Sequence, residues 1–165
     1  MPQTFPELLI WLFIINLGIA FGAGLYETRI VLPLWFSRSQ NGKYSVNVKA
    51  MNEIETGRKF WGFVTTMPLT LLTIINLIYA FRSLGTRHDW WLAASIIVLL
   101  ERILTFSYFI PTAIKLMKTD PIHQSDIPDT VSMWVRFNYF RNLLTITGLL
   151  LAMKVLSIPV FIHYQ

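Results

Sequence analysis

Two oppositely charged residues, Glu101 and Arg102, stand side by side in a segment, 90–109, that is otherwise mostly apolar. An ionised side chain at the centre of a bilayer costs at least ~2.5–3.5 kcal/mol, and such residues usually face the protein interior and mark functional sites. Neighbouring residues on a helix point about 100° apart. We therefore expect Glu101 and Arg102 to find different partners, with Arg141 and Asn138 as the partners of Glu101.

Polar or small side chains recur at helical spacing in four apolar segments, because residues three, four, seven and eleven positions apart share one face of a helix. Lipid cannot hydrogen-bond these groups, so we expect the stripes to face one another inside a helix bundle. In chain order, the stripes are Asn16, Ala20, Ala23 and Glu27, beside Gly24; Thr66, Thr70 and Thr73, near Asn76; Glu101, Thr105, Tyr108 and Thr112; and Trp134, Asn138, Arg141, Thr145 and Gly148.

The four stripes converge in one half of the membrane. At 1.5 Å per residue, Glu101 lies ~15 Å into its segment, while Glu27 and Arg141 lie near the ends of theirs that face the longer loops. We expect a cavity or polar knot lined by Glu27, Glu101, Tyr108, Asn138 and Arg141. Two interpretations stay open: an ion-pair network that fixes helix register, or a ligand-binding or catalytic site.

The composition places the chain among integral membrane proteins. Its 165 residues are 54% hydrophobic and only 14% charged, whereas soluble proteins carry roughly 25% charged residues. A span needs ~20 residues, which leaves room for about four spans and no second domain. The expected fold class is an all-α integral membrane protein, a four-transmembrane-helix bundle in one domain, 1–165. The absence of cysteine excludes disulfides, thiolate metal sites and cysteine nucleophiles.

The apolar runs predict spans at about 8–35, 60–81, 90–110 and 142–162. No Lys or Arg precedes the first run, which favours a retained span over a signal peptide. A helix that begins at Pro128 or Asp129 is expected to continue through Arg141 into the last span. The short link 82–89 predicts that the second and third spans form an antiparallel pair.

The segment between the first two spans is polar. Asn41-Gly42 is a turn signal within the predicted loop 37–46. Residues 47–59 are interpreted either as an amphipathic helix on the membrane surface or as a solvated loop. Pro68, inside the second span, is tolerated if a neighbouring group bonds to the carbonyl that it frees.

Lys and Arg near the span ends predict the orientation, because cytoplasmic loops are enriched in them. Arg82 and Arg87 lie on the poorer side, so both termini are expected outside a cell (inner) membrane, N-out/C-out. The net charge of +5 is interpreted as orientation charge and not as a nucleic-acid-binding surface. The richer side holds Arg38, Lys43, Lys49, Arg58, Lys59, Lys115 and Lys118, with Arg136 nearby.

Other features are expected to be structural. Gly18 and Gly22 form a GxxxG motif, interpreted as close packing within the bundle more than as a dimer contact. Lys154 is expected to snorkel or to pair with Glu7. An interfacial aromatic belt is predicted from Trp35, Trp61, Trp90, Trp91 and Tyr164.

A metal site is not expected. His88, His123 and His163 fall on a link, a loop and the C-terminus, without a partner one helical turn away. Glu27 and Glu101 are oxygen ligands of the kind that hard cations prefer, but the charge of Arg141 would oppose a cation. Neither a Ser-His-Asp set nor a Gly-rich phosphate loop is present in the sequence.

The segment Trp134-Val-Arg-Phe-Asn138-Tyr-Phe-Arg141 resembles the Trp-x-x-x-Asn-x-x-Arg element that begins the last span in the DUF1772 family of small four-span membrane proteins. That family includes the anthrone oxygenase-like proteins. The run Gly22-Ala-Gly-Leu-Tyr-Glu27 agrees with this resemblance, as do Pro33, Trp35, Phe60-Trp61 and Pro111. The resemblance covers most of the chain through short motifs.

This resemblance implies a membrane enzyme without a cofactor that acts on a small hydrophobic ring compound. Anthrone oxidation requires a base that removes a proton from carbon, a donor for the resulting oxyanion, and an apolar pocket. Glu27 or Glu101 is the expected base, and Arg141 with Asn138 or Tyr108 the expected oxyanion donor. The expected substrate-binding residues are Tyr108, Trp134, Asn138 and Asn16.

The rival hypothesis is a membrane protein that binds a lipid or quinone without catalysis, or a subunit of a membrane complex. The same polar parts would hold the head of a quinone, isoprenoid or lipid. The segment 47–59 would serve this rival as a docking element. The partners expected are membrane lipid, a small hydrophobic ligand or substrate, and a second copy of the chain in a homo-oligomer.

Overall fold

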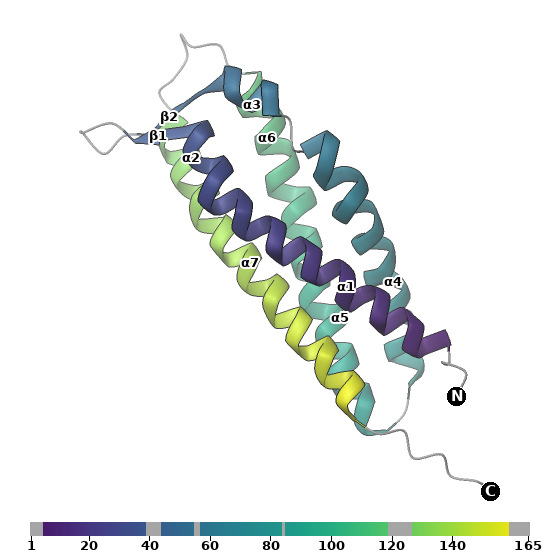
Figure 1. The fold of residues 1–165 in the computed structure, drawn as a ribbon. Helices are drawn as coiled ribbons and strands as arrows, with labels where there is room; N and C mark the ends of the chain where they lie inside the picture. Colours follow the sequence, from purple (N-terminus) through teal and green to yellow (C-terminus); the bar gives the residue numbers. More distant parts are fainter. Residues whose placement is uncertain (1–4, 39–43, 55–56, 84, 119–126, 159–165) are drawn as a thin grey trace, which may run out of the picture.

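A computed structural model describes residues 5–38, 44–54, 57–83, 85–118 and 127–158, except for the side chains of residues 57–59 and 86. Four helical segments run side by side along the long axis of the molecule (Figure 1). Each is long and apolar enough to cross a membrane: Phe5–Trp35, Phe60–Arg82, Arg87–Met117 and Ile127–Ser157. The protein is an all-α four-helix bundle of the multi-pass membrane type, as predicted.

Segments of π-helix occur in three of the four spans: inside the first and the third, and at the start of the second. The first span comprises α1 (Phe5–Tyr26), the π-helical η1 (Glu27–Val31) and α2 (Leu32–Trp35). The second comprises the π-helical η2 (Gly57–Thr66) and α4 (Met67–Arg82). The third comprises α5 (Thr86–Leu104), the π-helical η3 (Thr105–Phe109) and α6 (Ile110–Met117). The fourth is the single helix α7 (Ile127–Ser157).

The helices pack as a square bundle. Both α1 and α5 contact α4 on one side and α7 on the other. The predicted antiparallel pair of spans is confirmed, because α4 and α5 pack together on either side of a short link that contains Gly85. Gly85 has φ +86°, a conformation that glycine adopts at little cost. Helix α1 begins and α7 ends at the same end of the bundle (Figure 1).

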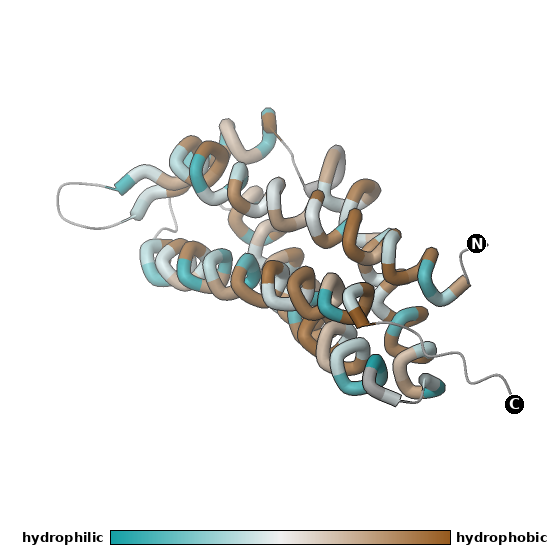
Figure 2. Tube along the Cα trace, turned by 60° about the horizontal axis from the view of Figure 1, so that its bottom comes forward, coloured by the Kyte–Doolittle hydropathy of each residue, from teal (hydrophilic) through white to brown (hydrophobic). Residues whose placement is uncertain are grey.

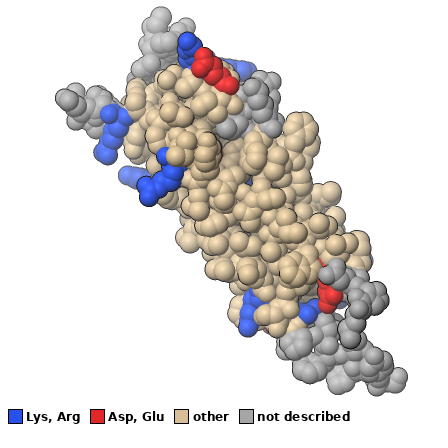
Figure 3. Space-filling view, in the orientation of Figure 1, with Lys and Arg blue, Asp and Glu red and all other residues tan. Residues whose placement is uncertain are grey.

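The outer surface of the bundle is suited to lipid. Side chains at helical spacing along η2 and α4 are exposed and apolar: Phe63, Met67, Leu71, Ile74 and Ile78. Hydrophilic residues lie mostly toward the ends of the helices in Figure 2. Figure 3 shows the visible charged side chains toward both ends of the long axis, with an uncharged band between them.

The predicted polar stripes face inward. Thr73, Asn76, Glu101 and Asn138 are each at most 1% exposed. Asn76 Oδ1 accepts a hydrogen bond of 3.0 Å from the indole N–H of Trp91. The interior of the bundle therefore contains a polar seam, as the helical spacing indicates.

The end of the bundle where the first span finishes differs from the predicted loop. Strands β1 (Phe36–Arg38) and β2 (Tyr44–Val46) pair antiparallel, with Phe36 opposite Val46. The predicted turn at Asn41-Gly42 lies outside the described residues. Helix α3 (Val48–Ile54) follows and buries Met51 completely. The predicted segment 47–59 is therefore helical over 48–54 and from residue 57 onward.

The last span begins earlier than its apolar run. That run predicts a span at 142–162, but α7 runs unbroken from Ile127 to Ser157, and residues 159–162 lie outside the described part. The polar stripe of α7 turns toward its neighbours, so the helix needs no continuous apolar run. The expected start of this helix at Pro128 or Asp129 is confirmed within two residues.

The interpretation of Gly18 and Gly22 as a site of close helix packing within the bundle is wrong. A Cβ added to Gly18 or Gly22 would meet no described atom within 4 Å. The close contacts fall instead on Gly24, where a Cβ would overlap the Asn142 side chain, and on Gly148, where it would overlap Val98. The helices approach closely where the polar stripes meet, and Gly18 and Gly22 lie on the outer face.

The aromatic belt and the Lys154 pair also need correction. Trp35 and Trp91 are 3% and 5% exposed, so they belong to the interior, whereas Trp90 is 42% exposed. Tyr164 lies outside the described residues. Glu7 Oε1 lies 3.9 Å from Arg87 Nη1, at the end of the bundle where α1 and α5 begin. Glu7 therefore forms its ion pair with Arg87 and not with Lys154.

Candidate functional site

All four spans contribute to one partly open cavity of about 500 Å³. This volume falls within the range of small-molecule sites, ≈ 300–1,000 Å³. Its wall is mostly apolar and carries large aromatic side chains from α2, η2, η3 and α7. These aromatic residues are Trp35, Trp61, Phe109 and Trp134. Glu27, Glu101, Arg102 and Arg141 supply charged groups to the same wall.

The first ion pair on the wall joins the first and last spans. Arg141 Nη2 donates to Glu27 Oε2 over 2.6 Å and to Asn138 Oδ1 over 2.6 Å. The guanidinium carbon lies 4.4 Å from the centre of the Phe109 ring and 5.1 Å from that of Trp61. Both partners are more than 90% buried. The positive charge is thus held by a carboxylate, an amide and two aromatic faces.

A hydrogen-bond network around Thr28 fixes this ion pair. Thr28 Oγ1 donates to Gly24 O over 2.7 Å and accepts from Asn138 Nδ2 at 2.7 Å and Asn142 Nδ2 at 3.1 Å. The missing side chain of Gly24 lets Asn142 approach the first span. The network sets the register of η1 against α7, and therefore positions Glu27 opposite Arg141.

The second ion pair lies within one helix and corrects the expected partners of Glu101. Arg102 Nε donates to Glu101 Oε2 over 2.5 Å, Arg102 Nη2 lies against the same oxygen, and Thr105 Oγ1 donates to Oε1 over 3.1 Å. The expected pairing with Arg141 and Asn138 is wrong. The Cβ atoms of neighbouring residues diverge, but the long arginine side chain curls back to the carboxylate. Arg141 is meanwhile held by Glu27.

Each π-helical segment borders the cavity and precedes a proline. The segments η1, η2 and η3 end two residues before Pro33, Pro68 and Pro111. A proline lacks the N–H that would bond four residues back, and its ring crowds that carbonyl. The wider turns place residues of the cavity wall, among them Glu27 and Phe109, just ahead of each proline. Single π-helical turns, the length of η1 and η3, frequently occur at functional sites.

Asn16 has a structural partner in the second span. Its Nδ2 donates to the carbonyl oxygen of Val64 over 3.1 Å. Val64 is the residue four positions before Pro68, whose missing N–H leaves that carbonyl without its usual α-helical donor. The expectation that a neighbouring group bonds to the carbonyl freed by Pro68 is confirmed. The same hydrogen bond occupies the amide nitrogen of Asn16.

The predicted site residues separate into two groups. Glu27, Glu101, Arg141 and Trp134 line the cavity. Tyr108, Asn138 and Asn16 are not among its lining residues. Asn138 supports Arg141 from behind. Tyr108 stacks edge-on against Phe137, with ring centres 4.8 Å apart, and its hydroxyl donates to the Thr130 carbonyl over 3.4 Å.

Three of the four aromatic residues on the wall, Trp35, Trp61 and Phe109, were not among the predicted site residues, and neither was Arg102. Trp35 and Trp61 stand near span ends, where an interfacial position is the simpler interpretation of a Trp. Whether Trp35 and Trp61 lie close to Glu27 and Arg141 depends on how the spans pack. The signal that was available for Trp35 is its position eight residues after Glu27, because residues seven and eight apart fall within one broad stripe of a helix.

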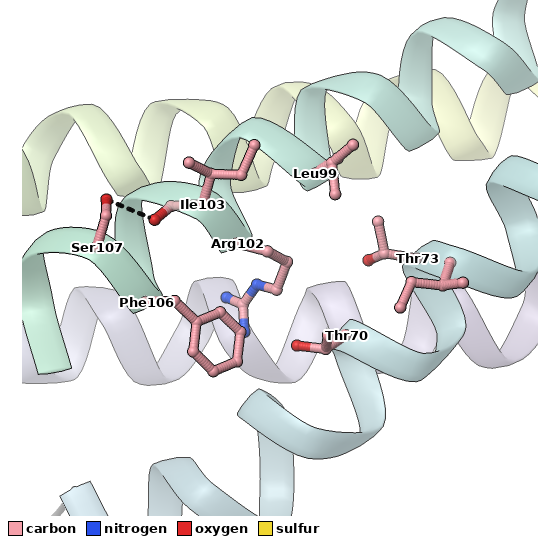
Figure 4. Close-up of a pocket in the computed structure, with 8 residues that line it drawn as sticks. Thr70, Thr73, Leu99, Arg102, Ile103, Phe106 and Ser107 are labelled. Atoms are coloured by element: carbon pink, nitrogen blue, oxygen red, sulfur yellow. Dashed lines mark hydrogen bonds between the residues drawn. The ribbon is translucent and has the colours of Figure 1, made fainter.

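A second hollow, a groove of about 390 Å³, lies between α4 and α5. Figure 4 shows its wall, with the Arg102 side chain lying between Thr70 and Phe106. Arg102 also lines the central cavity. Its guanidinium therefore stands between the groove and the cavity.

The charged groups of the two ion pairs balance one another on the cavity wall. Each carboxylate on the wall has its own guanidinium, so the cavity wall gains no net charge from these four groups. Within the described residues no three His, Asp or Glu side chains are placed to share a metal ion. Comparison of the chain with protein-family models, curated proteins and solved structures finds no match.

Proposed function

We propose that this protein is a membrane enzyme of the anthrone oxygenase-like type, which removes a proton from a small hydrophobic ring compound bound in the cavity. One observation carries the proposal: a buried Glu27–Arg141 ion pair lies on the wall of a partly open cavity that carries aromatic side chains. A carboxylate supplies a base, and a guanidinium supplies donors for the oxyanion that forms.

Charge balance makes this pair suitable for a neutral substrate. The carboxylate takes a proton from the CH₂ carbon that lies across the central ring from the ketone, and the electron pair of that C–H bond moves through the flanking aromatic rings to the ketone oxygen. The Arg141 donors then turn from Glu27 to this oxygen. The site is neutral before and after the step, so no isolated charge forms in a low-dielectric interior, where it would be costly.

Molecular oxygen completes the reaction as oxidant. The carbanion adds O₂, forming a carbon–oxygen bond, and the protonated carboxyl returns its proton to the peroxide. Loss of water from this hydroperoxide leaves a second carbonyl, so one CH₂ group and one O₂ give one C=O group and one water. Glu101 is the second candidate for the base, since it also lines the cavity.

The decisive test is turnover of a hydroxylated anthrone by purified protein in lipid nanodiscs. The rate of oxygen consumption measures this turnover. Glu27→Gln and Glu101→Gln keep the shape of the side chain and remove the base, and loss of a general base lowers turnover by about 10²–10⁴-fold. The matched control is Glu53→Gln, because the Glu53 side chain is 65% exposed on α3. Full activity in both buried variants would overturn the proposal, as would loss of the fold in both.

The rival function, binding of a lipid or quinone without catalysis, draws on the groove between α4 and α5. Its wall combines apolar side chains such as Leu99 and Ile103 with the polar side chains of Thr70 and Arg102. Native mass spectrometry of the purified protein would separate the two functions. A retained lipid or quinone that survives aerobic incubation unchanged would favour the rival.

We further propose that the protein lies in the cell (inner) membrane with both termini outside. The distribution of Lys and Arg supports this orientation. The chain has no cysteine. A single introduced cysteine is therefore the only residue that a maleimide labels, and its labelling shows on which side of the membrane it lies. Lys49→Cys, on α3, should react with an impermeant maleimide only after permeabilisation, and Arg82→Cys in intact cells. The reverse pattern would contradict the orientation.

A further inference from the structure

The central cavity is partly open, and the exposed residues of its wall show on which side. Four lining residues are exposed: Asn52 on α3, and Ile110, Ile114 and Lys118 at the end of the third span. The last three are spaced by four residues, so they share one face of α6 and its last turn. The open side of the cavity therefore runs along α6.

The second span forms the other edge of this opening. Trp61 and Gly62 of η2 also line the cavity, and both are only half-buried. The segment η2 packs mainly on α4 and α1, whereas α6 packs mainly on η3 and α3. The opening is therefore bounded by segments of two different spans, η2 and α6.

Helix α3 covers the cavity at the end of the bundle where α6 finishes (Figure 1). Met51 of α3 lines the cavity and is completely buried. Asn52 Nδ2 donates to the carbonyl oxygen of Met117 over 3.4 Å, which joins α3 to the last turn of α6. Because α3 closes this end, the open side of the cavity is the flank between η2 and α6, which we call the open flank.

The open flank is apolar along α6 and ends at a cation. Ile110 and Ile114 lie inside the third span, which finishes at Met117. Lys118 follows directly, eight residues after Ile110, which is about 12 Å along the axis. A lysine at the end of a span lies at the level of the lipid headgroups. The open flank thus has the polarity of an anionic amphiphile, with an apolar interior and a positive charge at the membrane surface.

The charges of the cavity wall do not balance at this outer end. Five charged residues line the cavity. Glu27 pairs with Arg141 and Glu101 pairs with Arg102. Among the described residues, no carboxylate lies within ion-pair distance of Lys118. The wall therefore carries one uncompensated positive charge, and a ligand with one negative charge is complementary to it.

We infer that the open flank binds a long-chain carboxylic acid from the membrane, with its carboxylate at Lys118 and its alkyl chain along Ile114 and Ile110 into the cavity. The ammonium group of a lysine is a compact charge with three donors, which suits a carboxylate. A cavity of about 500 Å³ has the size of a small-molecule site, which favours a ligand with one alkyl chain over a phospholipid with two. The inference goes beyond the proposed function, because it concerns the open flank and not the base and the oxyanion donors.

Hexadecanoic acid and its methyl ester separate the charge from the alkyl chain, because they share the same chain. Equilibrium dialysis against phosphatidylcholine nanodiscs that contain the protein gives both affinities, and empty nanodiscs correct for partition into lipid. At about pH 9 the carboxyl group is ionised and the lysine is charged. We expect the acid to bind about fivefold more tightly than the ester, which is the attraction of one lysine near a membrane surface for an anionic lipid.

Substitutions locate the two parts of the ligand. Lys118→Gln should remove the preference for the acid and leave ester binding unchanged, which also shows that the cavity is intact. Its matched control is Lys49→Gln, because the Lys49 side chain is 85% exposed on α3. Ile114→Trp fills part of the open flank and should weaken both ligands at least about threefold. Ile96→Trp, at a position of α5 that is 42% exposed, should change neither affinity.

Four results would overturn the inference. Equal binding of acid and ester by the unaltered protein would mean that the open flank does not recognise the charge. A preference for the acid that survives Lys118→Gln would place the recognising cation elsewhere. Unchanged binding in Ile114→Trp would place the alkyl chain elsewhere. Displacement of the acid by phosphatidylglycerol as effectively as by an excess of the acid itself would identify a phospholipid as the occupant. Turnover of the anthrone tests the proposed function separately.

Discussion

Removal of Arg141 should destabilise the protein more than removal of Glu27, although the two residues form one ion pair. Arg141→Gln leaves the Glu27 carboxylate, which is 5% exposed, without its cation. Breaking a buried pair in this way costs about 3–5 kcal/mol. Glu27→Gln leaves a cation that still has Asn138 and two aromatic rings, so we expect a loss of about 1.5–3 kcal/mol, typical of one hydrogen bond to a charged group.

The double variant tests whether the two residues interact directly. Because each single variant leaves the other partner unpaired, the combined loss should be smaller than the sum, by a coupling energy of about 2 kcal/mol. Reversible unfolding in mixed micelles or steric trapping in bicelles measures the four free energies of unfolding. The exposed pair Lys49–Glu53, with side chains 85% and 65% exposed, is the matched control, and its coupling should stay below roughly 0.5 kcal/mol.

Two results would refute this reasoning about the ion pair. Additive losses in the Glu27 and Arg141 variants would mean that the two side chains do not share a buried contact. A loss in Arg141→Gln no larger than in Lys49→Gln would mean that the site is open to water.

Two further substitutions test the contacts that position the site. Asn16→Leu should lower the free energy of unfolding by about 0.6–1.7 kcal/mol, the range for hydrogen bonds between membrane helices. The double variant with Pro68→Ala should recover most of this loss, because alanine restores the N–H within the second span. A loss that persists in full in the double variant would contradict the argument from the proline. Gly24→Ala should cost about 1–3 kcal/mol through overpacking against Asn142, whereas Gly18→Ala, in open space, should be neutral or stabilising in the same unfolding assay.

The number of spans and their inward faces could be predicted from the sequence because a bilayer limits the choices. Apolar length determines where a span can lie, and polar groups must turn away from lipid. Glu27, Glu101 and Arg141 could therefore be assigned to a common interior from their spacing along the spans. The prediction for the last span was least accurate, because its polar stripe around Asn138 interrupts the apolar run that was used to locate it.

Side-chain pairing could not be predicted in the same way. Helical geometry places the Cβ atoms of Glu101 and Arg102 apart, but it does not limit an arginine with several rotatable bonds. Gly24 and Gly18 have similar sequence surroundings, and only the packing of Asn142 against the first span shows which one is a close contact. The burial of Trp35 depends in turn on residues such as Phe109, Leu116 and Trp134, which belong to the same hydrophobic cluster but lie far away in sequence.

The two ion pairs differ in when they can form during synthesis. Glu101 and Arg102 are neighbours, so the third span can neutralise its own charges inside a single helix as it enters the membrane. Glu27 must wait for a residue 114 positions later. Since chains are made from the N-terminus, the first span remains with an unmatched carboxylate until the last one has been inserted. The Glu27–Arg141 contact thus cannot form before the last span has been made, and the wall of the cavity beside it is complete only when all four spans are present.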